Sequence, residues 1–151
     1  MLIVETPKDL AAYVGQPLGT SDWLEVTQEK ITAFADITGD HNWIHVDVER
    51  AKRELPGGRC IAHGCLTLSL MAQMSYGIYD VRRKSRGVFY GTEKVRFTAP
   101  VPAGSRIRLH QSLKEAVPVN GGYRYTTSCT VEIEGSDRPA MVAETIVLTF
   151  D

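Results

Sequence analysis

The residue types best suited to proton chemistry in this chain are a carboxylate and an imidazole five residues apart. Asp40 and His45 lie in the segment GDHNWIH, residues 39–45, and a second segment, IAHG, covers residues 61–64 and opens a long apolar run. A positioned acid and base can move protons beside a polarised carbonyl, and a glycine at a helix start leaves its N–H open to a substrate oxygen. The two segments together favour a small enzyme.

The elements that must position these residues begin with a predicted helix from Thr27 to about Thr38, whose apolar residues recur at helical spacing. Gly39 is expected to end that helix and to leave residues 40–45 on a loop. Asp47 can cap a short helix that runs through Val48 to about Glu54, before the sequence PGG breaks it.

The second half of the chain predicts one buried helix and a set of long strands. Residues 63–79 are apolar nearly all round, which is typical of a buried helix. The strands are expected over residues 18–26, 87–97, 106–117, 122–134 and 140–150, which are rich in β-branched and aromatic residues and separated by turn signals. This pattern predicts an α+β architecture in which an antiparallel sheet wraps around the helix.

Composition limits the class of protein. The 151 residues fit one domain, and 43% hydrophobic with 23% charged residues is ordinary for a globular protein. A net charge of -1 gives no lead toward nucleic acid or an anionic membrane surface, and no apolar run is long enough for membrane insertion. The N-terminus does not read as a signal peptide. The odd set of cysteines without CxxC predicts reduced thiols in a cytoplasmic protein: Cys60, Cys65 and Cys129.

Residues 34–69 and the segment KVRFTAPV, residues 94–101, resemble the MaoC-like dehydratases, also called R-specific enoyl-CoA hydratases. The resemblance covers nearly the whole chain and implies a hot-dog fold, a curved antiparallel β-sheet wrapped around a long central helix, as a single domain over residues 1–151. The segment GDHNWIH looks most like the short bacterial members related to the nodulation protein NodN. Trp43 stands where many relatives have proline, which alters the pocket wall without removing a catalytic group.

The resemblance implies that Asp40 and His45 are the catalytic pair and that Gly64 is the glycine of the central helix. The implied reaction is reversible hydration of trans-2-enoyl-CoA to (R)-3-hydroxyacyl-CoA. One water can supply both the hydroxide at C3 and the proton at C2, with Asp40 as base and His45 as proton shuttle, or with the two roles exchanged. The backbone N–H of Gly64, at the helix start, is expected to stabilise the developing charge on the thioester oxygen.

Five further residues are predicted to support this site. Asn42 is expected to shape the loop. For His63, the role of a hydrogen-bonded core histidine is preferred over that of a reacting group. Ser69 either bonds the backbone carbonyl one turn earlier or supports the catalytic loop, as in the family. Trp43 and Ile44 are the candidates for substrate binding.

No metal or redox cofactor is expected. Coenzyme A counts as part of the substrate, and acyl carrier protein is an alternative carrier of the acyl chain. A homodimer is expected because the family joins two sheets side by side, which also covers a sheet edge. The basic residues 82–86 are interpreted as a solvated loop, or as a contact for the phosphates of coenzyme A. No nucleic-acid partner is expected.

Three rival functions fit parts of the pattern. A zinc site could draw on Asp40, His41 and His45 together with Cys60, His63 and Cys65, which are near in sequence, but the i,i+4 spacing of His41 and His45 suits zinc only on a continuous helix. A hot-dog acyl-CoA thioesterase usually needs a carboxylate on the central helix, and residues 63–79 contain none. A non-catalytic acyl-thioester-binding protein would keep the fold without turnover.

Overall fold

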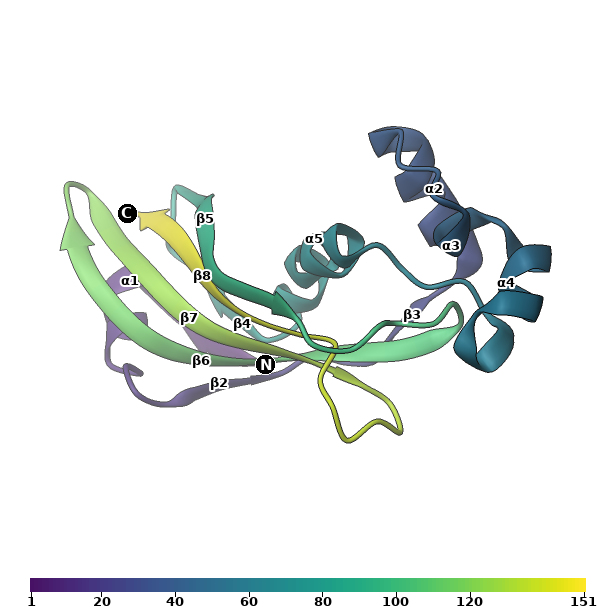
Figure 1. Cartoon of the computed structure of the whole chain (residues 1–151). Helices are drawn as coiled ribbons and strands as arrows, with labels where there is room; N and C mark the ends of the chain where they lie inside the picture. The colour runs from purple at the N-terminus through teal and green to yellow at the C-terminus, as the bar shows by residue number, and fades with distance from the viewer.

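A curved antiparallel sheet wraps around one central helix in the computed structural model, which describes residues 1–151 (Figure 1). The helix, α5 (Gly64–Ser75), lies on the concave side of the sheet. Four long strands form most of the sheet: β5 (Arg86–Phe97), β6 (Ser105–Val119), β7 (Gly122–Ile133) and β8 (Met141–Phe150). With β2 (Pro17–Thr20) included, the strand order is β2-β6-β7-β8-β5, which leaves β5 at an edge. The predicted α+β hot-dog architecture is thereby confirmed.

The core lies between α5 and the inner face of the sheet. Alternate residues of β6 turn inward, so Ile107, Leu109 and Leu113 are fully buried while their neighbours face outward. Helix α5 packs Leu66 and Met71 into the same cluster. Burial of this apolar surface supplies the main driving force for folding.

The predicted first strand over residues 18–26 is wrong as a continuous element. Two short strands, β2 (Pro17–Thr20) and β3 (Leu24–Val26), each pair with β6, and an irregular segment separates them. Ser21 accounts for the break, because its hydroxyl accepts a hydrogen bond from the Leu109 N–H at 2.9 Å in place of a regular strand partner.

The first residues form two elements that the sequence did not predict. Strand β1 (Leu2–Val4) pairs in parallel with β4 (Tyr79–Val81), which follows α5. Helix α1 (Pro7–Ala11) comes next and begins with a reciprocal capping box between Thr6 and Asp9. The central helix was predicted over residues 63–79. It ends earlier, at Ser75, because the chain then turns and forms β4.

The remaining helices gather at one end of the molecule, the end at which the chain enters α5 (Figure 1). They are α2 (Gln28–Thr38), α3 (Trp43–Val46), α4 (Val48–Glu54) and the short 3-10 turn η1 (Pro56–Gly58). The predicted caps at Thr27 and Asp47 are confirmed, since each side chain accepts a backbone N–H in the first turn. None of the helices combines the length and apolar character needed to cross a bilayer.

Candidate active site

Asp40 is placed by the end of helix α2. Gly39 takes the left-handed conformation (φ 77°) and its N–H donates to the Ala35 carbonyl, which ends the helix as predicted. The Asp40 carboxylate then accepts a hydrogen bond from the Asn42 N–H at 3.3 Å. Because 57% of the Asp40 side chain is exposed, its carboxylate remains open to a ligand.

His45 lies on the single turn α3, not on a loop as predicted, and is buried. Its Nδ1 lies 2.6 Å from the Ile61 carbonyl oxygen. A carbonyl can only accept, so Nδ1 carries the proton and Nε2 of the neutral ring keeps a free lone pair. The Gln28 amide also donates to the His45 carbonyl at 2.8 Å. Both contacts fix the orientation in which the imidazole can act as an acceptor.

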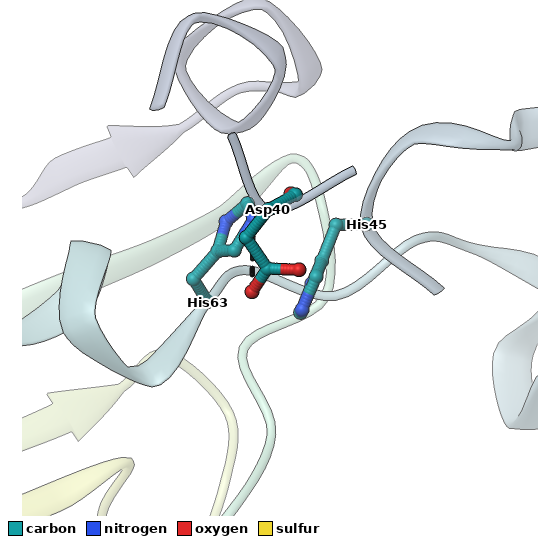
Figure 2. Close-up of side chains that lie close together, drawn as sticks. All are labelled: Asp40, His45 and His63. Atoms are coloured by element: carbon teal, nitrogen blue, oxygen red, sulfur yellow. Dashed lines mark hydrogen bonds and ion pairs between the residues drawn. The ribbon is translucent and has the colours of Figure 1, made fainter. Parts of the chain in front are cut away.

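His63 joins the two catalytic candidates. Its Nε2 donates to the backbone carbonyl of Asp40 at 3.0 Å, and its ring stacks on that of His45 with 3.8 Å between centroids. Figure 2 shows the Asp40 carboxylate beside both imidazoles, 4.0 Å from His63 Nε2. The other ring nitrogen of His63, Nδ1, is buried without a partner. These contacts support the predicted core role of His63, which orders the Asp40 loop.

Asp40, His45 and His63 are also close enough to be considered as metal ligands, since one ligand atom of each lies within 4.8 Å of the others. Metal-bound imidazoles direct their in-plane lone pairs at one point. Here the two rings are stacked 25° from parallel, and each has one nitrogen engaged with a backbone carbonyl. The geometry suits hydrogen bonding to a small ligand better than joint ligation of an ion.

Gly64 begins helix α5 and shares a cavity of about 290 Å³ with His45. The segment Phe97–Val101, part of the KVRFTAPV sequence, forms another wall of this cavity. A Cβ added to Gly64 would lie only 2.9 Å from the Phe97 ring, so a side chain is excluded unless that ring moves. Phe97 has no predicted role from the sequence, because only the folded sheet brings it close to Gly64.

The supporting residues predicted from sequence have different outcomes. Asn42 does shape the loop, since its side chain accepts from the Ile44 N–H at the start of α3. The hydroxyl of Ser69 donates to the Cys65 carbonyl at 2.8 Å, one turn earlier, which is the first of its two predicted partners. Trp43 stacks under the Arg50 guanidinium at 3.9 Å. Neither Trp43 nor Ile44 lines the cavity of His45, so their substrate contacts stay a prediction.

The basic residues after α5 are engaged within the protein. Arg82 pairs with Glu5 at 2.9 Å, and Lys84 pairs with Asp80 at 2.5 Å. These residues also follow the C-terminal end of α5, whereas His45 and Gly64 lie at its N-terminal end. Their pairing favours the surface interpretation over a contact for phosphates.

Comparison with known proteins adds a family match, two similar relatives and a similar solved structure. A family described as "MaoC like domain" matches residues 9–133. The 3-hydroxyacyl-thioester dehydratase Z of Mycobacterium tuberculosis is 49% identical over 148 residues, 97% of each chain. Nodulation protein N of Rhizobium leguminosarum bv. viciae is 44% identical over 146 residues, which cover 95% of this chain and 91% of that protein. Among solved structures, the R-hydratase PhaJ1 of Pseudomonas aeruginosa superposes with a TM-score of 0.75 at 22% identity, over 91% and 82% of the two chains.

Proposed function

The chain belongs to the MaoC-like dehydratase family, and we propose from this premise that it hydrates trans-2-enoyl-CoA reversibly to (R)-3-hydroxyacyl-CoA. The observation that carries the proposal is the common position of three groups. His45 and Gly64 line one cavity, and the Asp40 carboxylate lies beside the same imidazole. The relative from Mycobacterium tuberculosis is named a dehydratase of 3-hydroxyacyl thioesters, which is the reverse of this reaction.

The protons can be moved by a single water held between Asp40 and His45. The free lone pair of His45 Nε2 accepts one hydrogen as the water oxygen bonds to C3, and the imidazolium then returns that proton to C2. The Asp40 carboxylate accepts a hydrogen bond from the second O–H of the water, which remains as the hydroxyl of the product, and it stabilises the transient positive charge on the ring. The Ile61 carbonyl supports this sequence because it holds the proton on Nδ1.

The thioester oxygen gains negative charge while C2 resembles an enolate. The first N–H groups of a helix have no intrahelical partner, and the helix dipole favours negative charge there. We assign the Gly64 N–H to this oxygen, because Gly64 is the first residue of α5 and lacks a side chain that would cover the group.

Three features accompany this proposal. The acyl chain is carried by coenzyme A, acyl carrier protein being the alternative, and the chain's own residues perform the reaction without a metal or redox cofactor. We propose that residues 1–151 form one domain. We also propose a homodimer through the edge strand β5, which exposes Phe89 and Tyr90 beside its unpaired backbone.

The test is loss of the enoyl-thioester absorbance when purified protein meets crotonyl-CoA and longer 2-enoyl-CoAs. We expect fast decay and an (R)-3-hydroxyacyl product on chiral chromatography. The variants Asp40→Asn and His45→Gln should be nearly inactive while retaining the circular dichroism of the wild type. Release of free thiol in place of hydration would indicate a thioesterase, and tight binding without turnover would indicate a non-catalytic binding protein.

A further inference from the structure

Three polar side chains line the cavity of about 290 Å³ that contains His45 and Gly64. His45 is the proposed proton acceptor, and the hydroxyl of Thr98 already donates to the Pro139 carbonyl. The third is Thr67, near the start of α5, which has no part in the reaction so far. A larger cavity, of about 530 Å³, lies along the later turns of α5, and Thr67 does not line it. Any ligand of the Thr67 hydroxyl therefore binds at the catalytic end of the helix.

The hydroxyl of Thr67 has no hydrogen-bond partner in the protein, although only 2% of the residue is exposed. A hydroxyl within a helix commonly donates to the carbonyl four residues earlier, as Thr38 and Ser69 do here, each at 2.8 Å. Thr67 makes no such bond, and the His63 carbonyl accepts the Thr67 N–H at 3.2 Å instead. A buried hydroxyl without a partner is unfavourable, so a group that enters the cavity is expected to bond it.

The Thr67 oxygen is open to a group in the cavity. Three side-chain atoms of the protein are both unpartnered and closed to solvent: His63 Nδ1, Gln111 Oε1 and Arg124 Nε. The Thr67 oxygen is not among them, so the small exposed area of this residue includes its hydroxyl. Because the residue lines the cavity, a ligand there can reach the hydroxyl, whereas no ligand can reach Gln111 Oε1.

Thr67 and Gly64 lie on the same side of α5, because residues three apart in a helix are neighbours on its surface, and both line the cavity. Side chains of a helix lean toward its N-terminus, so the Thr67 hydroxyl lies over the first turn, beside the Gly64 backbone. That turn carries the N–H groups without intrahelical partners and the positive end of the helix dipole. The hydroxyl and the Gly64 N–H therefore face the same part of the cavity.

We propose that the Thr67 hydroxyl is a second donor to the thioester oxygen, alongside the Gly64 N–H. The oxygen gains negative charge as C2 becomes enolate-like, and two donors stabilise that charge better than one. The hydroxyl keeps its proton throughout, so it supplies a hydrogen bond and takes no part in the proton transfer at Asp40 and His45. This inference rests on the proposed function, because it assumes that an acyl thioester binds beside His45 and Gly64.

Turnover of crotonyl-CoA gives the kinetic test. Thr67→Val keeps the shape of the side chain without its hydroxyl and should lower kcat about 10²-fold with little change in KM, because the oxygen gains its charge only during the reaction. Thr67→Ser keeps the donor and should recover most of the rate. The Tm of Thr67→Val should not fall, since the hydroxyl has no partner in the protein. Thr126→Val is the matched control and should keep kcat, because it removes a buried hydroxyl from strand β7 that lines neither cavity.

Infrared difference spectra of bound butyryl-CoA, labelled with carbon-13 at its carbonyl, test the contact itself. This saturated thioester can be neither hydrated nor dehydrated, and a hydrogen bond to its carbonyl lowers the stretching frequency. The frequency should be higher in Thr67→Val than in the wild type, and Thr67→Ser should return it toward the wild-type value.

An unchanged carbonyl frequency in Thr67→Val would overturn the inference even if kcat fell, because the hydroxyl would then act on another atom. Full kcat in Thr67→Val would overturn it as well. The outcome is separable from the proposed function. Hydration of crotonyl-CoA with an unchanged carbonyl frequency refutes only the role of Thr67, whereas absence of hydration with every enoyl-CoA refutes the hydratase, and the saturated thioester still decides whether Thr67 contacts the carbonyl.

Discussion

The polar side chains at the two ends of helix α5 differ in what holds them. At the N-terminal end, His45 and His63 each donate to a backbone carbonyl, at 2.6 and 3.0 Å, and their rings stack on each other. At the far end, the amide of Gln111 contacts only a thiol, and its oxygen has no partner. The fold therefore fixes in advance the proposed proton acceptor, His45, and the imidazole that stacks on it, as positioning for catalysis requires.

Removal of the proposed reacting groups at the N-terminal end of α5 should have the largest effect on activity. Asp40→Asn and His45→Gln should each lower kcat by roughly 10²–10⁴, because the first removes the carboxylate that holds the water and the second removes the base that takes its proton. The double variant should lose little more than the worse single one, since the pair acts as a unit. Stopped-flow absorbance with crotonyl-CoA measures this, and full activity in either single variant would move the reaction away from this end of α5.

A second change blocks the proposed oxyanion position. Gly64→Val should lower kcat by about 10²–10³, because the side chain covers the first N–H of α5 and presses on Phe97, with Gly64→Ala showing a smaller loss. Phe97 is half exposed, so its ring has room to move and the fold should survive. The double variant Gly64→Val with Phe97→Leu separates the two causes. Recovery of kcat would assign the loss to Phe97 crowding and contradict the oxyanion role.

A third change removes a hydrogen bond that orders the N-terminal end of α5 and leaves Asp40 and His45 in place. His63→Leu should lower the free energy of unfolding by about 1–3 kcal/mol, because the Asp40 carbonyl loses its buried donor. It should also lower kcat about 10-fold, as loss of one positioning hydrogen bond predicts. His63→Gln keeps a donor and should recover part of both, as measured by urea unfolding and enoyl-CoA turnover. Equal losses in the two variants would mean that ring packing, not the hydrogen bond, matters.

The smallest expected effect is a pH dependence beside the catalytic loop. The Asp36 carboxylate accepts a hydrogen bond from His41 and raises the pKa of that imidazole above its usual value of 6.5. Since the folded pKa is raised, protonated His41 stabilises the fold fully at pH values below 6.5, and this contribution is lost as the pH rises through the raised pKa. Both side chains are more than half exposed, so the effect is small.

Thermal melting of wild type and His41→Gln across this pH range checks the prediction. The wild type should have the higher Tm on the acidic side, with the two curves converging in mildly alkaline buffer. A difference that is the same at every pH would show that the imidazole contributes packing and no charge.

The fold was predictable because its signals are local. Alternation along residues 122–134 and the apolar run after His63 predict strands and a buried helix whatever surrounds them. The caps at Thr27 and Asp47 are likewise specified by neighbouring residues, and they were predicted correctly. The β1–β4 pairing was missed because three-residue strands carry almost no periodic signal and depend on a partner 77 residues away.

The candidate site was predictable only in part. Asp40, His45 and Gly64 could be named from motif context, but the stacking of His63 on His45 results from tertiary packing between α3 and the residue before α5. Ser69 was left between two partners, since a hydroxyl in the middle of a helix can bond either its own backbone or a neighbour. Gln111 gave no signal at all. In the sequence it is one polar residue in an alternating strand, and only the sheet register turns it inward beside Thr145.

The parallel pairing of β1 with β4 also bears on how this protein can diverge. All three residues of β4 line the larger cavity, whereas the residues of β1 that hold them in register line neither cavity. Substitutions in residues 2–4 can therefore shift the wall of that cavity without contacting substrate. Mutation and selection can in this way reshape this cavity, about 530 Å³ along the later turns of α5, from the start of the chain, while the surroundings of Asp40 and His45 stay constant.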